Sequence, residues 1–249
     1  NMCVPFGKIL RGKVVPNTVT KTLHTDKVYE PELDSYAIEA FPYYSPLESQ
    51  IKTIRSFDRP VILVDDLVHK ADRLQALAPS LKKAGIPVKK VVVGVISGYG
   101  RDLMETFHLP VESIYSMPNL RQWFVESTLY PFIGGDTVRR RDMKVAGLQP
   151  SVNMILPYAA PRLSGCSREA LYEFSVCCIE NSRDLLQVLE TEYRSQFARN
   201  LTLSRLSEAV ILPLCPDKGS CMEYDENLAA SVYLENDLEM LGRMKKFMV

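Results

Sequence analysis

One run of residues, 59–73, constrains the fold of this chain more than any other. It contains four consecutive apolar residues, Val61 to Val64, of which three are β-branched. A short apolar run that is opened by Pro60 and followed by two acids is typical of a buried parallel strand. Asp65 and Asp66 would then lie at the carboxyl end of this strand, where open α/β sheets bind their ligands.

An amphipathic helix is predicted to follow this strand, over residues 74–84, and to end at Gly85. The residues that would share its buried face are Leu74, Leu77, Ala78 and Leu81. A strand, an acidic pair, a short loop and a helix together are typical of a phosphate site, because backbone N–H groups at the start of a helix attract anions. The alternative is that Asp65 and Asp66 only end the strand and cap the helix.

This arrangement resembles the ribose-phosphate loop of type I phosphoribosyltransferases. The resemblance implies that Asp65 and Asp66 are the catalytic acidic pair, which binds the ribose hydroxyls of phosphoribosyl pyrophosphate. The sequence departs from the family in the next loop. The family has Thr/Ser-Gly-x-Thr/Ser around the 5′-phosphate, whereas residues 70–73 read Lys-Ala-Asp-Arg. Because the glycine and both hydroxyls are missing, we expect Lys70 and Arg73 to supply charge to the substrate instead, opposed by the acid between them.

The N-terminal residues fit the same resemblance. An apolar segment runs into Pro5-x-Gly7-Lys8, where the family has its pyrophosphate loop. The resemblance therefore implies that Gly7 and Lys8 contact the substrate, and that a first element of the family is missing before residue 1. An ordinary Pro-x-Gly turn is the alternative.

A β-hairpin is predicted from two segments. Residues 18–28 alternate and are rich in Thr and Val, and residues 36–41 form a second apolar run. The family has a flexible hairpin here, whose basic residues touch pyrophosphate, so the resemblance implies that Lys21 contacts the substrate. Further candidates on the same grounds are Arg11, Lys13 and Lys27. A solvated β-ribbon is the alternative for each of them.

The segments around the central strand are predicted from caps and apolar runs. Ser45 and Glu48 form the pattern of a capping box for a helix over residues 46–56. Two more strands of the sheet are predicted, over residues 88–96 and 111–116.

A loop with two glycines is predicted between these two strands, over residues 97–102, before a short helix at 103–108. Such a loop can cradle an anion. The resemblance implies that Tyr99 stacks on the base of the substrate. An ordinary strand-to-helix turn is the alternative.

Residues 118–130 have the pattern of an amphipathic helix, with Trp123 in the core. The glycine-rich run at 134–137 follows, and residues 139–141 are three arginines. This run is either a phosphate or carboxylate site with arginines for bidentate contacts, or a glycine turn before a basic surface helix.

From about residue 151, glycine becomes scarce and the apolar residues recur with helical period. Helices are predicted at residues 167–197, 201–210 and 227–248. We therefore expect two domains, an α/β domain over residues 1–150 and a helical appendage over residues 151–249.

Composition excludes several classes of partner. The chain has 30 basic and 30 acidic residues, so its net charge gives no support for nucleic acid or a membrane surface as a partner. No apolar run reaches the length of a transmembrane helix. Its six cysteines form no CxxC pair, so we expect reduced thiols in a cytoplasmic protein and no zinc site.

The expected fold is an open, mostly parallel α/β sheet of phosphoribosyltransferase type, with a flexible β-hairpin and a helical C-terminal appendage. The expected ligand is phosphoribosyl pyrophosphate or a related sugar phosphate or nucleotide, with Mg²⁺ bridged by pyrophosphate and water. In an enzyme, ribose 5-phosphate would pass to a nitrogen base. The alternative is a non-catalytic regulatory protein of the same fold that binds a nucleotide or sugar phosphate. Either could be a homodimer.

Overall fold

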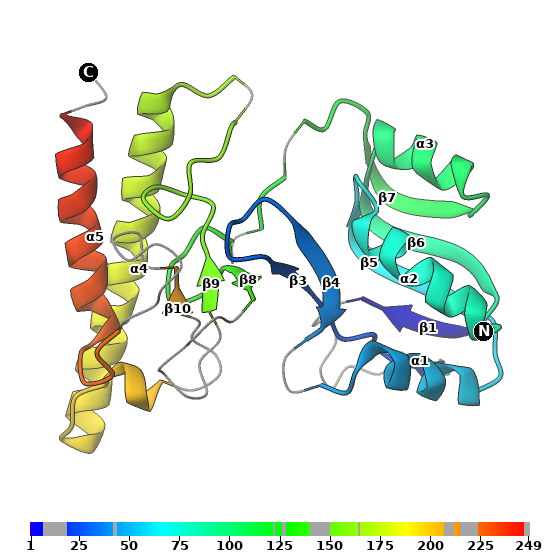
Figure 1. Cartoon of the computed structure of the whole chain (residues 1–249), viewed down its shortest axis with the longest axis horizontal. Coiled ribbons are helices and arrows are strands. Elements are labelled where there is room, and N and C mark those ends of the chain that lie inside the picture. The colour runs from blue at the N-terminus through cyan, green and yellow to red at the C-terminus, as the bar shows by residue number, and fades with distance from the viewer. Residues whose placement is uncertain are drawn as a thin grey trace. The chain divides into compact units, whose positions relative to one another are not determined.

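The structure is a computed structural model that describes residues 1–6, 19–41, 44–121, 123–125, 128–139, 150–163, 165–206, 212–214 and 224–246. The chain divides into two compact units (Figure 1). The first comprises Asn1–Lys27 and Ala37–Arg121, and the second comprises Val28–Tyr36 and Gln122–Val249. The main boundary between the units thus lies after residue 121 and not near the predicted residue 150. The short segment Val28–Tyr36 also belongs to the second unit.

A parallel five-stranded sheet forms the centre of the first unit. Its strands in chain order are β1 (Met2–Pro5), β2 (Val19–Thr20), β5 (Val61–Val68), β6 (Val88–Ser97) and β7 (Val111–Met117). They are arranged as β2-β1-β5-β6-β7, and each neighbouring pair is parallel. The predicted parallel α/β sheet is therefore confirmed at the level of fold class.

The central strand of this sheet is β5, which contains the acidic pair. Val61 and Leu63 are fully buried, as expected of a strand with neighbours on both sides. Strand order reverses between β1 and β5, since β1 has the next strand in the chain, β2, on its other side. In doubly wound sheets, ligands bind outside the carboxyl ends of the strands at such a reversal.

Three helices accompany this sheet: α1 (Leu47–Ser56), α2 (Asp72–Lys83) and α3 (Gly98–Thr106). Their apolar residues pack against those of the strands in one core, which includes Ile51, Ile54, Leu74, Leu77, Leu81 and Met104. The apolar periodicity of residues 74–84 therefore predicted the buried face of α2 correctly.

The predicted capping box of α1 is wrong. The N-cap of the helix is Pro46, and no side chain caps it. The carbonyl oxygen of Ser45 instead accepts a hydrogen bond from Nε2 of Gln50 at 2.7 Å. Gln50 is buried and also bonds the backbone of His24, so it fixes the start of the helix in place of a cap.

The predicted loop over residues 97–102 is also wrong, because these residues are the cap and first turns of α3. Ser97 is the N-cap, and its Oγ accepts a hydrogen bond from the backbone N–H of Gly100 at 2.9 Å. The low helix propensity of the two glycines suggested a loop. The segment is helical nevertheless, and the serine cap stabilises it by pairing an N–H group that has no partner within the helix.

A second sheet is arranged as β10-β9-β8-β3-β4. Its strands are β3 (Thr25–Tyr29), β4 (Tyr36–Ala40), β8 (Asp136–Val138), β9 (Pro150–Val152) and β10 (Leu212–Pro213). Strands β3 and β4 are neighbours joined by a turn in which the N–H of Glu30 donates to the carbonyl oxygen of Ser35 at 3.0 Å, as expected of the hairpin. The predicted first strand, 18–28, is split, because β2 and β3 belong to different sheets.

The second unit contains two long helices, α4 (Arg168–Phe197) and α5 (Ala230–Lys245), which lie side by side (Figure 1). The helix predicted at residues 167–197 is confirmed as α4, and Ser167 is its N-cap, accepting a hydrogen bond from the N–H of Ala170 at 3.0 Å. The predicted helix at 201–210 is reduced to one 3₁₀ turn, η2 (Leu203–Arg205), in the residues that the structure describes. Strands β9 and β10 also belong to the region that was expected to be helical.

The segment predicted as a helix at residues 118–130 contains no α-helix in its described part. Trp123 is 45% exposed, so it is not a core residue. The chain passes from one unit to the other at residue 121, so this segment does not pack along one face as a single helix would. Of its apolar residues, the later ones, such as Leu129, are buried in the core of the second unit.

Among the described helices, none combines the length and the apolar character needed to cross a membrane.

Candidate functional site

The acidic pair lies in the second half of the central strand. β5 continues past both acids to Val68, with Asp65 in register with Val93 of β6. The side chain of Asp65 is only 10% exposed, whereas that of Asp66 is 54% exposed. The two carboxylates therefore differ in environment, which the sequence did not indicate.

Asp65 is an unusual carboxyl group because it is buried next to a cation. Its Oδ1 accepts hydrogen bonds from Nη1 of Arg73 at 2.9 Å and from the N–H of Asp66 at 3.0 Å. Burial raises the pKa of Asp65 from 3.8 to about 7, while the charge of Arg73 limits the rise. Groups whose pKa is shifted strongly by burial and by a specific charge occur preferentially at functional sites.

Arg73 is the second residue of α2 and contacts both acids. Its Nη1 lies 2.9 Å from Oδ1 of Asp65 and 3.9 Å from Oδ1 of Asp66. The residue expected to attract a phosphate is therefore engaged with the acidic pair. Lys70 is exposed and forms no ion pair with any described residue, although its carbonyl oxygen accepts a hydrogen bond from Gln75 at 2.7 Å.

Ala71 has the backbone conformation of a glycine. Its φ is 56° and its ψ is 29°, in the left-handed region, which costs a residue with a Cβ about 1–2 kcal/mol. It is also the N-cap of α2, and no side chain caps this helix. The first N–H groups of a helix have no partner within the helix. The position that lacks the family's glycine thus keeps the backbone shape that a glycine would give.

His69 is a residue that the sequence reasoning missed. It directly follows β5, and its Nδ1 lies 2.8 Å from Oγ of Ser97, the N-cap of α3. Its ring also meets that of Tyr99 edge to face, at 6.0 Å between ring centres. Tyr99 is 57% exposed and lies in the first turn of α3, so the candidate for base stacking is close to the end of β5. A histidine three residues after an acidic pair was the available signal.

The remaining predicted contacts are not joined to the acidic pair. Gly7 and Lys8, like Arg11 and Lys13, lie outside the described residues. Lys21 directly follows β2, and its N–H donates to the carbonyl oxygen of Cys3 at 3.0 Å. No hydrogen bond or ion pair between Lys21 and the acidic pair is found in the described part of the chain.

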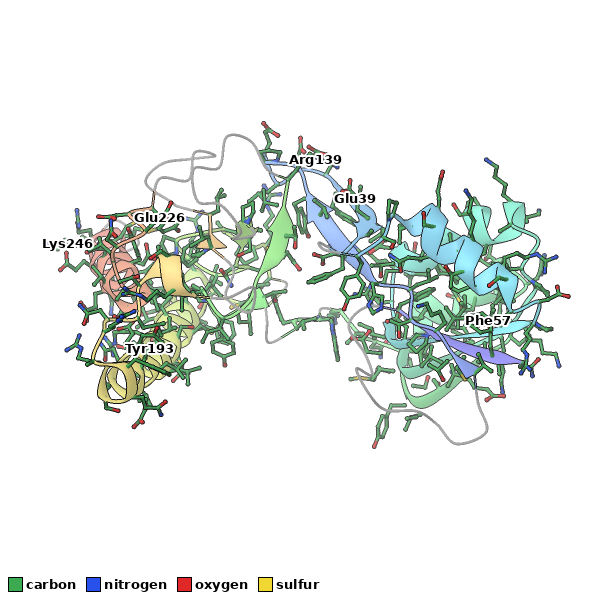
Figure 2. All side chains as sticks on the ribbon, turned by 90° about the horizontal axis from the view of Figure 1, so that it is seen from below. Glu39, Phe57, Arg139, Tyr193, Glu226 and Lys246 are labelled. Carbon is green, nitrogen blue, oxygen red and sulfur yellow. The ribbon has the colours of Figure 1, made fainter. Side chains whose placement is uncertain are left out.

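The glycine-rich run at 134–137 follows a turn at residues 131–133 and leads into β8, which begins at Asp136. Gly135 has a φ of 147°, and a Cβ there would lie 2.6 Å from Oγ of Ser151, so this position requires glycine. Arg139 is one of the residues labelled in Figure 2. Its Nε donates to a carboxylate oxygen of Glu30 at 2.8 Å. These contacts favour the structural interpretation of the run. The two following arginines lie outside the described residues.

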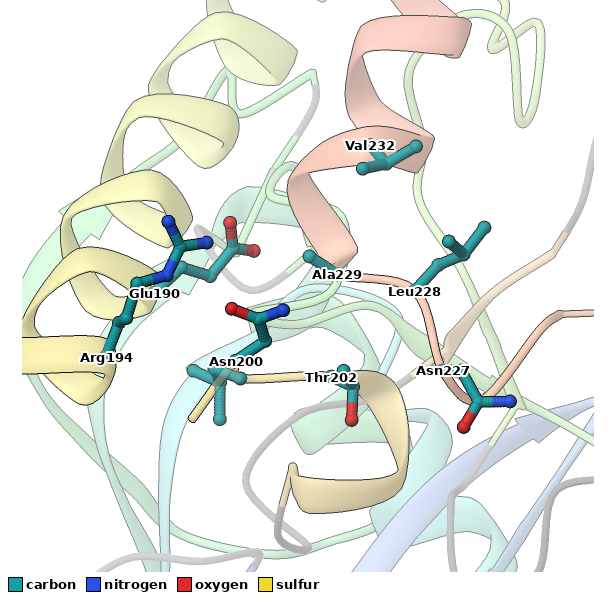
Figure 3. Close-up of a pocket in the computed structure, with 9 residues that line it drawn as sticks. Glu190, Arg194, Asn200, Thr202, Asn227, Leu228, Ala229 and Val232 are labelled. Atoms are coloured by element: carbon teal, nitrogen blue, oxygen red, sulfur yellow. The ribbon is translucent and has the colours of Figure 1, made fainter. Parts of the chain in front are cut away.

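A cavity of about 210 Å³ lies in the second unit, between α4, the start of α5 and the chain around η2 (Figure 3). The carboxylate of Glu190 accepts hydrogen bonds from the N–H and the hydroxyl of Ser231, at 3.1 and 2.6 Å, and so caps α5 from α4. The polar residues of this cavity therefore include a helix cap, and no residue predicted for a ligand site lines it.

The described residues offer no protein-built metal centre. No group of three His, Cys, Asp or Glu side chains able to hold a metal is found among them. Mg²⁺ can, however, be held by one or two carboxylates together with waters and substrate phosphates. The exposed Asp66 fits this limited role, whereas Asp65 already accepts a hydrogen bond from Arg73.

No protein-family model matches this sequence, and no curated protein matches it at a significant level.

Proposed function

We propose that the first unit binds phosphoribosyl pyrophosphate or a closely related sugar phosphate at the carboxyl end of β5, as type I phosphoribosyltransferases do. The observation that carries this proposal is the left-handed Ala71 at the uncapped start of α2, directly after the acidic strand. A strained backbone that opens a helix without a cap is suited to an anion, because the N–H groups and the helix dipole both favour negative charge. The reversal of strand order beside β5 supports the same place.

In this proposal, each part of the site has one role. Asp65 and Asp66 accept hydrogen bonds from the ribose hydroxyls, and the exposed Lys70 attracts the 5′-phosphate to the N–H groups at the start of α2. Arg73 exchanges its contact with Asp65 for one with the ligand. Tyr99 packs on the base. On the family's pattern, Gly7, Lys8 and Lys21 complete the pyrophosphate side of the site.

In the enzyme form of this proposal, a ring nitrogen of the base attacks the anomeric carbon of the sugar, the bond from that carbon to pyrophosphate breaks, and pyrophosphate leaves. Mg²⁺, carried mainly by the pyrophosphate oxygens, would offset the charge of this leaving group. The contribution of the protein is to hold the ribose by its hydroxyls and to place the base by Tyr99.

A second candidate function is a non-catalytic regulatory protein that binds a nucleotide or sugar phosphate. One observation favours it: Arg73, which forms an ion pair with the acidic pair in the described part of the chain, already lies 2.9 Å from Asp65. A ligand must compete with this ion pair, which suits a protein that responds to ligand concentration. Pyrophosphate release from phosphoribosyl pyrophosphate, tested with a panel of purine and pyrimidine bases, separates this candidate from the enzyme.

Binding is tested by titration calorimetry with phosphoribosyl pyrophosphate and with ribose 5-phosphate, in the presence of Mg²⁺. Two charge-assisted hydrogen bonds of about 1.5–3 kcal/mol each are lost in the double variant Asp65→Asn, Asp66→Asn, so affinity should fall by roughly two to four orders of magnitude. The double variant Asp102→Asn, Glu105→Gln is a matched control, because both acids are exposed on α3. A wild-type protein that binds neither compound would refute the proposal.

A further inference from the structure

The ring of His69 is held by the residue that caps α3. Ser97 is fully buried, and its Oγ lies 2.9 Å from the N of Gly100 and 2.8 Å from Nδ1 of His69. The ring of Tyr99 contacts the same imidazole edge to face. A side chain fixed by a buried hydroxyl and a ring contact is preorganised, so that it loses little freedom when it meets a ligand.

These two hydrogen bonds favour one tautomer of His69. A serine hydroxyl has one proton to donate. Oγ of Ser97 accepts from Gly100, and in the described part of the chain the one acceptor available to its own proton is Nδ1 of His69. We therefore expect the neutral imidazole to accept at Nδ1 and to carry its proton at Nε2, since the hydroxyl proton of Ser97 would otherwise have no acceptor among the described residues.

The Nε2–H group of His69 is an unused donor at the carboxyl end of the central strand. It has no hydrogen-bond partner among the described residues. His69 lies between Val68, the last residue of β5, and the left-handed Ala71 that begins α2. The donor thus lies in the short loop between β5, the strand that contains the acidic pair, and the uncapped start of α2.

We infer that His69 is a further ligand-binding residue, which donates the Nε2–H hydrogen bond to a phosphate oxygen of the bound sugar phosphate. This inference rests on the proposed function of the same site. In the resembled family, Thr or Ser hydroxyl groups of this loop bind the 5′-phosphate. The imidazole of His69 would supply part of that hydrogen bonding here. Ser97 is then a positioning residue, because it acts on the ligand only through His69.

The protonation of His69 can be read directly from long-range ¹H–¹⁵N correlation spectra of the imidazole nitrogens at pH 8. The chain has 3 histidines, and single substitutions assign their signals. We expect His69 to be protonated at Nε2 and not at Nδ1. Addition of ribose 5-phosphate should shift the Nε2 signal of His69 and leave that of the exposed His108 unchanged. Protonation at Nδ1, or an unmoved Nε2 signal under saturating ligand, would overturn the inference.

Three variants test the contribution of His69 to affinity. His69→Asn keeps a polar group near the position of Nδ1 and removes the outer donor, so ribose 5-phosphate should bind roughly ten- to a hundredfold more weakly, as expected for a hydrogen bond to a charged group. His69→Gln places an amide N–H near the position of Nε2 and should recover most of the affinity. His108→Asn is the matched control, and we expect unchanged binding.

The outcomes separate this inference from the function on which it rests. If the carboxyl signals of the acidic pair respond to ribose 5-phosphate while His69→Asn binds as tightly as wild type, only the role of His69 is refuted. If no signal responds and calorimetry detects no binding of either ribose 5-phosphate or phosphoribosyl pyrophosphate, both proposals fall.

Discussion

Gly100 meets the backbone of Val68 so closely that a Cβ atom at position 100 would lie 2.3 Å from the carbonyl oxygen of Val68. The first turn of α3 therefore packs directly on the last residue of β5. Only glycine allows this approach, because any other residue brings a side-chain atom into the carbonyl group. The same contact sets Ser97 and His69 at hydrogen-bonding distance.

Gly100→Ala should consequently weaken the first unit by about 1–3 kcal/mol, as overpacking does. It should also disturb the hydrogen bond from Ser97 to His69. Amide hydrogen exchange of β5 and β6 measures the first effect, and the imidazole ¹⁵N signals report the second. Gly242→Ala is the control, because a Cβ at that position in α5 would meet no atom within 4 Å beyond its chain neighbours and the backbone of its own helix. It should stabilise the second unit by about 0.5–1 kcal/mol.

Ala71→Gly should raise both stability and affinity for ribose 5-phosphate. Glycine removes a left-handed strain of about 1–2 kcal/mol and lets the backbone approach an anion. Ala198→Gly is the matched control, since Ala198 has a φ of 50° at the end of α4. Both variants should become more stable, but only Ala71→Gly should bind more tightly. Equal affinity in the wild type and Ala71→Gly would contradict a phosphate site at this loop.

The stability of the first unit should fall between about pH 4 and pH 7. The pKa of Asp65 is raised by folding from 3.8 to about 7, so its contribution is fully present below the lower value and is lost as the pH rises through the higher one. At about 1.4 kcal/mol for each pH unit, the loss is at most roughly 4 kcal/mol. Hydrogen exchange of β5 as a function of pH measures it.

Asp65→Asn should abolish this pH dependence, because an amide does not ionise. Asp66→Asn serves as its control, and it should retain the pH dependence since Asp65 is intact. A first unit whose stability is the same at pH 4.5 and pH 7.5 in the wild type would contradict the burial of an ionisable Asp65.

Arg73→Met should raise the pKa of Asp65 above its value of about 7, because the guanidinium favours the ionised carboxylate. Carboxyl ¹³C signals followed through a pH titration measure this change. Arg101→Met is the control, as Arg101 contacts the hydroxyl of Ser116 at 3.3 Å and forms no ion pair with a carboxylate of a described residue. An Asp65 that titrates at the same pH in Arg73→Met and wild type would show that the ion pair is not formed in solution.

The double variant Lys70→Ala, Arg73→Ala tests the charge of the loop. We expect it to bind phosphoribosyl pyrophosphate more weakly than the wild type, because both basic residues of the segment 70–73 are removed. Calorimetry at two salt concentrations should also show a weaker dependence on ionic strength. Equal binding in the wild type and the double variant would assign the ligand to backbone N–H groups alone.

The sequence was sufficient to predict features that depend on local pattern. Continuous β-branched runs identified β5 and β6, and the apolar spacing of Leu74, Leu77 and Leu81 identified the buried face of α2. The acidic pair was placed on the correct strand, because the strand itself was unambiguous. Such features are encoded within a few neighbouring residues and need no tertiary contact to be recognised.

Features that arise from contacts distant in sequence were not predictable in this way. His69 and Ser97 are 28 residues apart, and their contact depends on the pairing of β5 with β6. The left-handed Ala71 runs against the preference of alanine, so tertiary packing decided its conformation. The burial of Asp65 likewise follows from the neighbours of β5, not from its own side chain.

The path of the chain between the two units limits how this protein can be divided. The chain enters the second unit at residue 28, leaves it after residue 36 and returns at residue 122. A fragment that stops at Arg121 would therefore retain Val28 and Tyr29 without β8, their neighbour in the sheet. No single cut yields both units complete, because a cut after Arg121 keeps every residue of the first unit but separates Val28–Tyr36 from the rest of the second.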